Sequence, residues 1–201
     1  MSDSLPLVLA SASPRRRELL ERVGYRLDVA PADIDESIVA EEEPEAYTLR
    51  LALEKATVVA AAHPGRWVIA ADTTVAVGND ILGKAESEEE ATQMLLRLVG
   101  GSHRVITAFA ICGPNVGPHS ELVTTRVTMR QADKSEIERY VRSGEWVGKA
   151  GAYAVQGIAA ALISKVDGSI TNVIGLPLAE VVLALAELGA PLADYENGDP
   201  V

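Results

Sequence analysis

The chain has 201 residues, a formal net charge of −11 and a pI near 4.7. Hydrophobic residues make up 48% and charged residues 23%, which excludes intrinsically disordered and low-complexity chains. The acidic charge argues against a nucleic-acid backbone as partner, and the single cysteine, Cys112, excludes a disulfide framework and a cysteine-based zinc site.

Targeting and membrane signals are absent from the sequence. Residues 1–4 carry no basic leader, and the apolar run 5–10 is too short for a secretion signal. The apolar run 179–190 is interrupted by Glu180 and Glu187, so it is not expected to span a membrane. We therefore expect a cytoplasmic protein with no membrane partner. We also expect a single domain over residues 1–201, because no linker divides the chain.

In chain order, the first elements are a strand over 5–10, a helix that ends at Gly24, and a strand over 25–30. Ser13 is a favourable N-cap, and Pro14 fits the first helical position. An acidic loop follows, and then a long helix over 44–63. Its spacing predicts a buried face formed by Leu49, Leu53, Ala56 and Ala60.

The middle of the chain reads as a strand over 67–77, a tight turn at 78–80 and a helix over 86–99. Two paired strands, 103–112 and 122–130, are predicted to flank a loop over 113–120. A capping box at Asp133 and Glu136 begins the next helix, which ends near Ser143.

The last part of the chain is predicted to hold a loop of small residues over 148–157, a hairpin made by 158–166 and 170–174, and a helix over 177–188. Helices alternating with strands and hairpins indicate an α/β fold with a mixed sheet.

The first candidate site lies where the first strand meets the first helix. There Ser11 and Ser13 precede three consecutive arginines: Arg15, Arg16 and Arg17. The N-terminus of a helix carries partial positive charge, so three cations there are unfavourable unless an anion binds. A phosphate-binding site is one interpretation. A solvated arginine face, with Arg17 paired to Glu21, is the other.

Asp72 is the second candidate, because it interrupts an apolar strand and is followed by Thr73 and Thr74. A buried carboxylate is costly unless it is paired or binds a metal. We favour a functional carboxylate on the floor of a cleft over a structural one.

Further candidates surround these two. Glu36 could hold a divalent cation, whereas Asp33 and Asp35 of the same loop are expected to be solvated. Lys55 and Lys84 could reach the same cleft. In the small-residue loop, Gln156 could read the edge of a base, although the loop could equally be a tight packing turn. Phosphate-loop, dinucleotide-binding and serine-hydrolase motifs are absent.

Several of these short stretches, in this order, resemble the Maf family of nucleoside-triphosphate pyrophosphatases. They span nearly the whole chain and comprise residues 9–16, 35–36, 50 with 55–56, 71–73, 83–84, 149–153 with 156–157, and 172–177. One departure is Ala85, where the family usually has proline.

The resemblance implies a mixed, twisted sheet with flanking helices and two lobes around a cleft, as in inosine triphosphatases, and a homodimer. It implies hydrolysis of dTTP and UTP to the monophosphate and pyrophosphate, a house-cleaning reaction that uses Mg²⁺ or Mn²⁺. Asp72 falls on the catalytic position, and Glu36 with Asp72 on the metal site. The positions for substrate binding and specificity are Ser13, Arg15, Arg16, Lys55, Thr73, Lys84 and Gln156.

Two other functions stay open at this point. One is a nucleotide-binding regulator of cell division and septum formation without turnover. The other is a phosphomonoesterase, which would release orthophosphate. Whether the substrate is a canonical or a modified pyrimidine nucleotide is also open.

Overall fold

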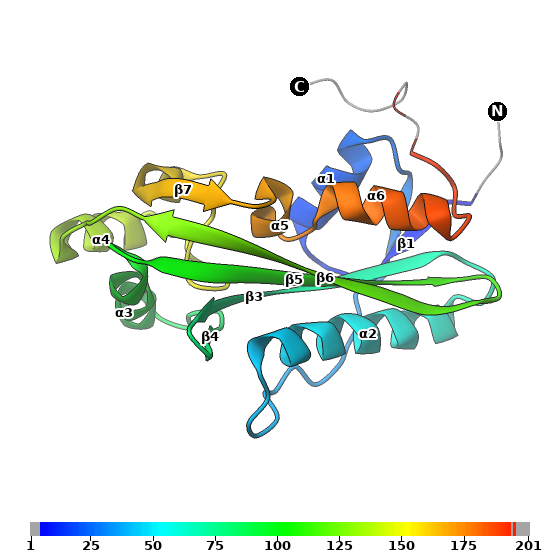
Figure 1. The fold of residues 1–201 in the computed structure, drawn as a ribbon, viewed down its shortest axis with the longest axis horizontal. Helices are drawn as coiled ribbons and strands as arrows, with labels where there is room; N and C mark the ends of the chain where they lie inside the picture. The colour runs from blue at the N-terminus through cyan, green and yellow to red at the C-terminus, as the bar shows by residue number, and fades with distance from the viewer. Residues whose placement is uncertain (1–4, 194, 196–201) are drawn as a thin grey trace.

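A seven-stranded mixed sheet forms the centre of the computed structural model, which describes residues 5–193 and 195 (Figure 1). The order of its strands is β2-β1-β3-β5-β6-β7, with β4 paired to β3. Strand β1 is parallel to β2 and β3, and the other pairs are antiparallel. The strands are β1 (Leu7–Leu9), β2 (Leu27–Val29), β3 (Val68–Val77), β4 (Asp80–Leu82), β5 (Ser102–Gly113), β6 (Val116–Met129) and β7 (Ile163–Asp167).

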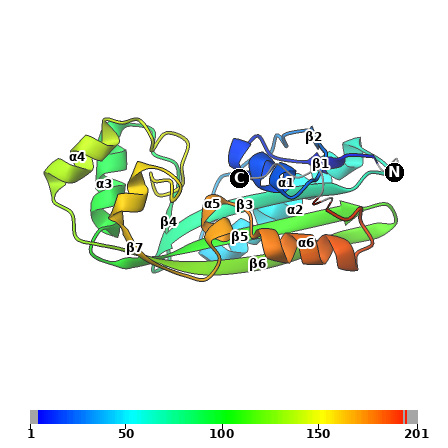
Figure 2. The same cartoon turned by 90° about the horizontal axis from the view of Figure 1, so that it is seen from above.

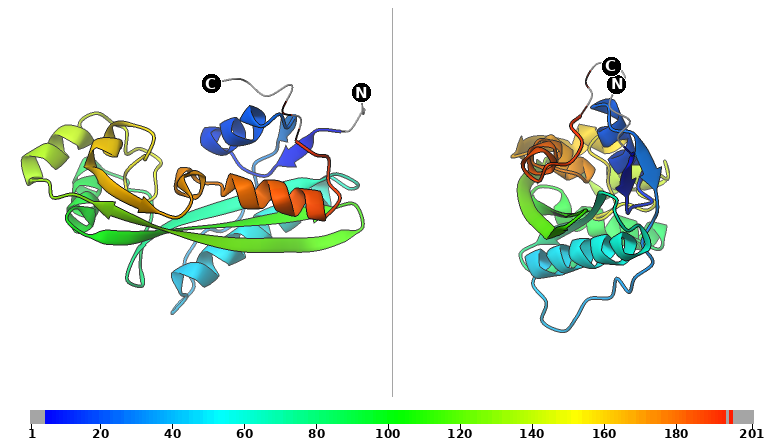
Figure 3. Two further views of the ribbon diagram at one scale, coloured as in Figure 1. Left: turned by 45° about the horizontal axis from the view of Figure 1, so that its top comes forward. Right: turned by 90° about the vertical axis from the view of Figure 1, so that its right-hand side faces the viewer.

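Helices cover both faces of this sheet. Helix α2 lies on one face, and α1, α5 and α6 lie on the other, while α3 and α4 stand at the far end of the long strands (Figures 1 and 3). The helices are α1 (Pro14–Arg22), α2 (Pro44–Ala62), α3 (Glu88–Leu98), α4 (Lys134–Val141), the 3₁₀ helix η1 (Ile158–Leu162), α5 (Ile170–Ile174) and α6 (Leu178–Glu187). Within the described ranges, none of the helices is long and apolar enough to cross a membrane.

The helices and strands form two lobes (Figure 2). Each lobe has its own buried apolar side chains. In the first lobe, Val8 and Val68 pack toward α2, whereas Leu9 and Ile69 pack toward α1 and α6. In the second lobe, α3, α4 and η1 pack on the other half of the same long strands. The predicted fold, a mixed α/β sheet with two lobes, is confirmed.

Strand β3 positions the polar residues between the lobes. Successive side chains alternate between the two faces of a strand, so Asp72 and Thr74 face α2 and Thr73 faces α1 and α5. In the described part of the chain, β1 pairs with β3 only at Val68 and Ile69, and β4 joins only from Val75. Between these points one edge of β3 is open, and side chains from both of its faces can reach a common space.

The predicted hairpin over 158–174 is wrong. Only Ile163–Asp167 is a strand, because 158–162 forms a 3₁₀ turn and Ile170–Ile174 forms a helix. The Ser169 hydroxyl caps that helix by accepting the Asn172 N–H at 3.2 Å, and the Asn172 amide donates to the Val105 carbonyl at 3.0 Å. These buried polar contacts outweigh the β-branched composition of the segment.

The predicted loop over 113–120 is also wrong for most of its length. Strands β5 and β6 stay paired as far as Gly113 and Val116, so the turn is much tighter than expected. The first half of β6 is half-buried to exposed, and its pairing with β5 shifts register between Ile111 and Gly113.

The buried face of α2 is offset from the predicted one. Ala56 is buried as expected, but Leu49, Leu53 and Ala60 are only half-buried, and the deeply buried polar positions are Thr48 and Lys55. Both polar side chains turn inward because β3 offers them partners, which are Thr74 for Thr48 and Asp72 for Lys55.

Candidate active site

A cavity of about 810 Å³ lies between the two lobes. Its floor is β3, one wall is the start of α1, and another is the loop 147–157. Every residue expected at the site lines this one cavity: Ser13, Arg15, Arg16, Glu36, Lys55, Asp72, Thr73, Lys84 and Gln156. The structure thus brings the predicted site residues together in one cavity, while their assignment as site residues and the role of each stay predictions.

The lining is locally positive in an acidic chain. Five cationic side chains line the cavity, against three acidic ones: Arg15, Arg16, Lys55, Lys84 and Lys149 against Glu18, Glu36 and Asp72. The chain as a whole carries a net charge of −11. An anionic ligand would thus be attracted by the local field of the cavity and not by the protein as a whole.

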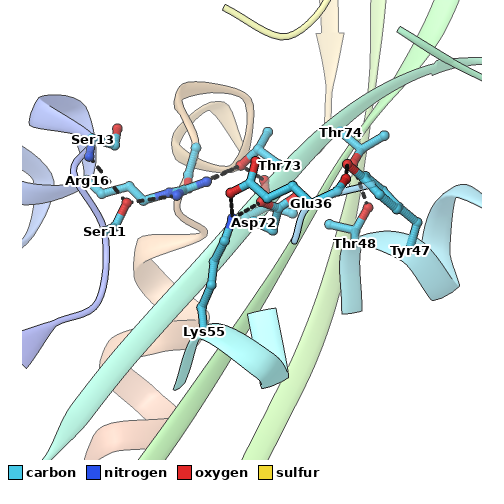
Figure 4. A network of polar contacts seen from close by, with 12 residues as sticks. Ser11, Ser13, Arg16, Glu36, Tyr47, Thr48, Lys55, Asp72, Thr73 and Thr74 are labelled. Atoms are coloured by element: carbon cyan, nitrogen blue, oxygen red, sulfur yellow. Dashed lines mark hydrogen bonds and ion pairs between the residues drawn. The ribbon is translucent and has the colours of Figure 1, made fainter. Parts of the chain in front are cut away.

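Two carboxylates in this cavity share one lysine (Figure 4). The Lys55 ammonium lies 2.7 Å from Asp72 Oδ1 and 2.6 Å from Glu36 Oε1. Lys55 and Asp72 are 8% and 9% exposed, so their charges compensate each other inside the protein. Burial opposes the ionisation of Glu36, but the hydrogen bond and charge of Lys55, with the charges of Lys84 and Arg16, outweigh it and lower its pKa.

Arg16 crosses the cavity from α1 to β3 and α5 (Figure 4). Its guanidinium donates to the Gly175 carbonyl at 2.8 Å, to Ser11 Oγ at 3.0 Å and to Thr73 Oγ1 at 3.0 Å. The Thr73 hydroxyl also contacts Thr107 Oγ1 at 3.0 Å. Burial lowers the pKa of Arg16, while the nearby charge of Asp72 opposes that shift. Arg16 therefore joins three elements and still places a positive charge at the cavity.

The start of α1 is open toward the cavity. Ser13 is the N-cap as expected, but its side chain makes no capping hydrogen bond, and its N–H donates to Ser11 Oγ at 3.3 Å. Arg15 lines the cavity, and burial lowers its pKa. Arg17 instead points to solvent and pairs with Glu21 at 2.7 Å. The phosphate-site interpretation thus fits Arg15 and Arg16, and the solvated interpretation fits Arg17.

The loop that carries Glu36 is anchored to α2. The Tyr47 hydroxyl donates to the Glu36 carbonyl at 2.9 Å, and Arg50 donates to the Ser37 carbonyl at 3.1 Å. Asp35 accepts the Ser37 N–H at 2.9 Å and is exposed. Asp35 thus shapes the loop, and only Glu36 of the predicted acidic group lines the cavity.

The loop of small residues pairs directly with the segment that carries Lys84. Lys84 forms an antiparallel bridge with Ala150, and the Gly151 N–H donates to the Gly83 carbonyl at 3.0 Å. This pairing holds the segment in place although Ala85, which is buried, stands where the family usually has proline. Gln156 lines the same wall with its side chain exposed.

A second, smaller cavity of about 160 Å³ adjoins the first on the α2 side. The two share Glu36, Asp72, Thr73, Lys84 and Ala150 in their linings. Asp72 is therefore reached from two spaces and not only from the main cavity.

Sequence reasoning missed two contributors to the site. Lys149 belongs to the loop of small residues and was not among the predicted binding residues, yet it adds a cation to the lining. Burial, and then the neighbouring charge of Arg15, lower its pKa. The backbone carbonyl of Gly175 accepts a hydrogen bond from Arg16, and a pattern of side chains cannot predict a contact to a backbone atom. Of these two residues, only Lys149 could have been found from the sequence, because a lysine in a run of small residues is a recognisable pattern.

Comparison with known proteins shows which family the chain resembles. The family model described as Maf-like protein matches residues 6–188. A dTTP/UTP pyrophosphatase of Myxococcus xanthus (strain DK1622) is 53% identical over 193 residues, covering 95% of this chain and 96% of the relative. A dTTP/UTP pyrophosphatase of Caulobacter vibrioides is 50% identical over 184 residues, covering 91% of this chain and 95% of the relative.

Among solved structures, a HAM1 protein from Coxiella burnetii superposes with a TM-score of 0.51 at 15% identity. The match covers 92% of this chain and 100% of the other, and it shows a shared fold alone. The family match extends over nearly the whole chain, from the first strand to the end of the last helix. The chain therefore belongs to the Maf family.

Proposed function

We propose that this protein is a nucleoside-triphosphate pyrophosphatase that hydrolyses dTTP and UTP to the monophosphate and pyrophosphate. The observation that carries this proposal is the cationic cavity that faces the paired carboxylates Glu36 and Asp72. The proposed substrates, dTTP and UTP, come from the names of relatives that are about 50% identical over most of the chain. The reaction belongs to the hydrolases that act on acid anhydrides.

The triphosphate would lie against the start of α1 and the cationic walls. Free N–H groups and the positive end of the helix dipole favour an anion there, and the Ser13 hydroxyl is free of a capping bond. Arg15, Lys84 and Lys149 line the same cavity, and Lys84 pairs with Ala150, next to Lys149. The charge of Arg16 acts from a fixed position, because the protein already occupies three of its N–H donors.

The carboxylates fit a divalent cation that is shared with the substrate. Among the described residues, His, Cys, Asp and Glu form no group of three that could hold a metal. One or two carboxylates suffice for Mg²⁺ when phosphate oxygens supply further ligands. Glu36 and Asp72 would hold this cation. When bound, it would offset the negative charge that develops on the phosphate oxygens.

Asp72 is the proposed general base. It would orient a water molecule and accept its proton as the water oxygen bonds to the α-phosphorus. The bond from the α-phosphorus to the bridging oxygen then breaks, and the cationic walls neutralise the departing pyrophosphate. The smaller cavity, which Asp72 also lines, offers room for water beside a bound nucleotide.

Gln156 is the proposed reader of the base. Its amide can donate to the O4 atom of thymine or uracil and accept from the N3–H group of the same ring. A base without that pattern would leave polar groups unpaired, which weakens its binding. Thr73 would act indirectly, because its hydroxyl accepts from Arg16 and contacts Thr107.

Residues 1–201 are proposed to act as one catalytic domain, of which residues 1–4, 194 and 196–201 lie outside the described part. The homodimer implied by the family resemblance stays a prediction, and so does the cytoplasmic location expected from the sequence.

The direct test is to identify the products across a panel of nucleoside triphosphates with Mg²⁺ or Mn²⁺, by chromatography. We expect dTMP or UMP together with pyrophosphate, and faster turnover of dTTP and UTP than of purine nucleotides. Release of orthophosphate alone would indicate a phosphomonoesterase, and binding without turnover would indicate a regulator.

Asp72→Asn should retain the fold and reduce turnover by about 10²–10⁴-fold, which is the typical contribution of general acid–base catalysis. The asparagine can still accept a hydrogen bond from Lys55, but it cannot take a proton from water. Asp80→Asn is the matched control, because Asp80 pairs with Arg97 on the surface. Turnover of Asp72→Asn near that of the control would remove Asp72 from its proposed role.

Gln156→Glu should lower kcat/KM for dTTP and UTP by about 10-fold or more, because a carboxylate cannot donate to O4 of the pyrimidine. The loss for GTP should be smaller, since guanine offers N1–H and N2–H donors. Gln131→Glu makes the same change in charge outside the cavity lining and should leave the ranking of substrates unchanged. Equal losses for all nucleotides in Gln156→Glu would point to general repulsion of phosphate.

Two neighbouring arginines test the division of roles in α1. Arg16→Lys keeps the charge but loses most of the bonds to Gly175, Ser11 and Thr73, so the free energy of unfolding should fall by about 2 kcal/mol. Arg17→Lys disturbs only an exposed ion pair, so the free energy of unfolding should change by less than about 0.5 kcal/mol. Urea denaturation measures both. Similar values for the two variants would contradict the joining role of Arg16.

A further inference from the structure

The ammonium group of Lys55 stands in the space between the two carboxylates proposed to hold a divalent cation. Its nitrogen contacts Glu36 Oε1 at 2.6 Å and Asp72 Oδ1 at 2.7 Å (Figure 4). Both are short, charge-assisted contacts. Glu36 comes from the loop before α2, Asp72 from β3 and Lys55 from α2, so one side-chain cation joins three separate segments.

Burial makes this contact strong. Lys55 is 8% exposed and Asp72 is 9% exposed, and a buried ammonium group needs a compensating anion. Lys84 is different, because it is exposed and its nitrogen is 3.9 Å from Glu36 Oε2. Only Lys55 combines burial with contact to both carboxylates among the described lysines that line the cavity.

A metal ion and this ammonium group compete for the same oxygens. Mg²⁺ binds oxygen ligands at about 2.1 Å, so an ion on Glu36 and Asp72 would come within a few ångströms of the Lys55 nitrogen. Like charges at such distances repel strongly away from bulk water. The positive charge of Arg16 also acts on both carboxylates and adds to this repulsion.

We propose that Lys55 is a tethered cation that occupies the divalent-metal position of the nucleotide-free protein. The metal would then bind weakly to the free protein and arrive together with the triphosphate. Lys55 has a flexible four-carbon stem and lines the same cavity, so it can transfer its contact from the carboxylates to phosphate oxygens. The inference rests on the proposed function and adds the order in which metal and nucleotide are bound.

The test measures Mn²⁺ binding to the nucleotide-free protein, from the electron paramagnetic resonance signal of free Mn²⁺. Lys55→Met should bind Mn²⁺ about tenfold or more tightly than the unaltered protein, because it removes a positive charge from between the ligands. Lys55→Gln removes the charge while keeping a hydrogen-bond donor, and it provides the answer if the methionine variant does not fold. Lys55→Arg, which keeps the charge, should bind Mn²⁺ no more tightly than the unaltered protein.

Lys165→Met is the matched control for net charge. Lys165 pairs with Asp167 on the exposed strand β7, so its loss changes the total charge equally but leaves the carboxylates untouched. Its Mn²⁺ affinity should stay within about twofold of the unaltered protein. Tightening by both uncharged Lys55 variants, but not by this control, supports the inference.

Two outcomes would overturn it. Equal or weaker Mn²⁺ binding in folded Lys55→Met or Lys55→Gln would show that Lys55 organises the carboxylates without excluding the metal. If Lys165→Met bound Mn²⁺ as tightly as the Lys55 variants, the change in net charge alone would explain the effect. Neither outcome would contradict the proposed activity, because the products are identified with the unaltered protein.

Discussion

A carboxylate within a buried strand has to be balanced by a positive charge, and Asp72 meets this requirement through Lys55 of α2. The balance depends on the alternation of β3, which directs Asp72 and Thr74 toward α2 and Thr73 toward α1. It also depends on the open edge of β3 between the points where β1 and β4 pair with it. At that open edge, side chains from both faces of β3 can reach one common space.

The local charge of the cavity matters more than the charge of the chain. An acidic protein would repel a nucleoside triphosphate at long range, but salt screens that repulsion beyond about 10 Å. Within the cavity, cations from α1, α2, the segment after β4 and the loop before η1 meet around one space. Segments distant in the sequence thus create a positive site that no single stretch of the chain contains.

Much of the fold and of the candidate site could be predicted from the sequence, because its signals are local. Ser13 with Pro14 indicates the start of α1, and the polar interruption at Asp72 indicates a cleft. The residues also offered Glu36, Lys55 and Gln156 as candidates, and the resemblance to the Maf family favoured their functional interpretation and suggested a role for each.

The incorrect predictions share one physical cause. In each case a contact with a residue distant in the sequence determines the structure, and the local sequence pattern does not. Lys55 is buried because Asp72 faces it, so helical periodicity of apolar residues could not predict the face of α2. The segment 170–174 is rich in β-branched residues, but it is helical, and its buried Asn172 donates to the Val105 carbonyl and to Thr125 Oγ1. The Arg16–Gly175 bond joins residues at opposite ends of the chain, and such a contact has no local signature.

The long strands have a consequence for how the cleft can move. Strands β3, β5 and β6 pass without a break from one hydrophobic core into the other, so the lobes share a single hydrogen-bonded sheet. Domains joined by a few loop residues can close by a hinge, but bending here would distort many inter-strand hydrogen bonds at once. Closing the cleft is therefore expected to cost more here than in proteins with a loop hinge, and we expect long side chains and the loops around the cavity to adjust to a ligand first.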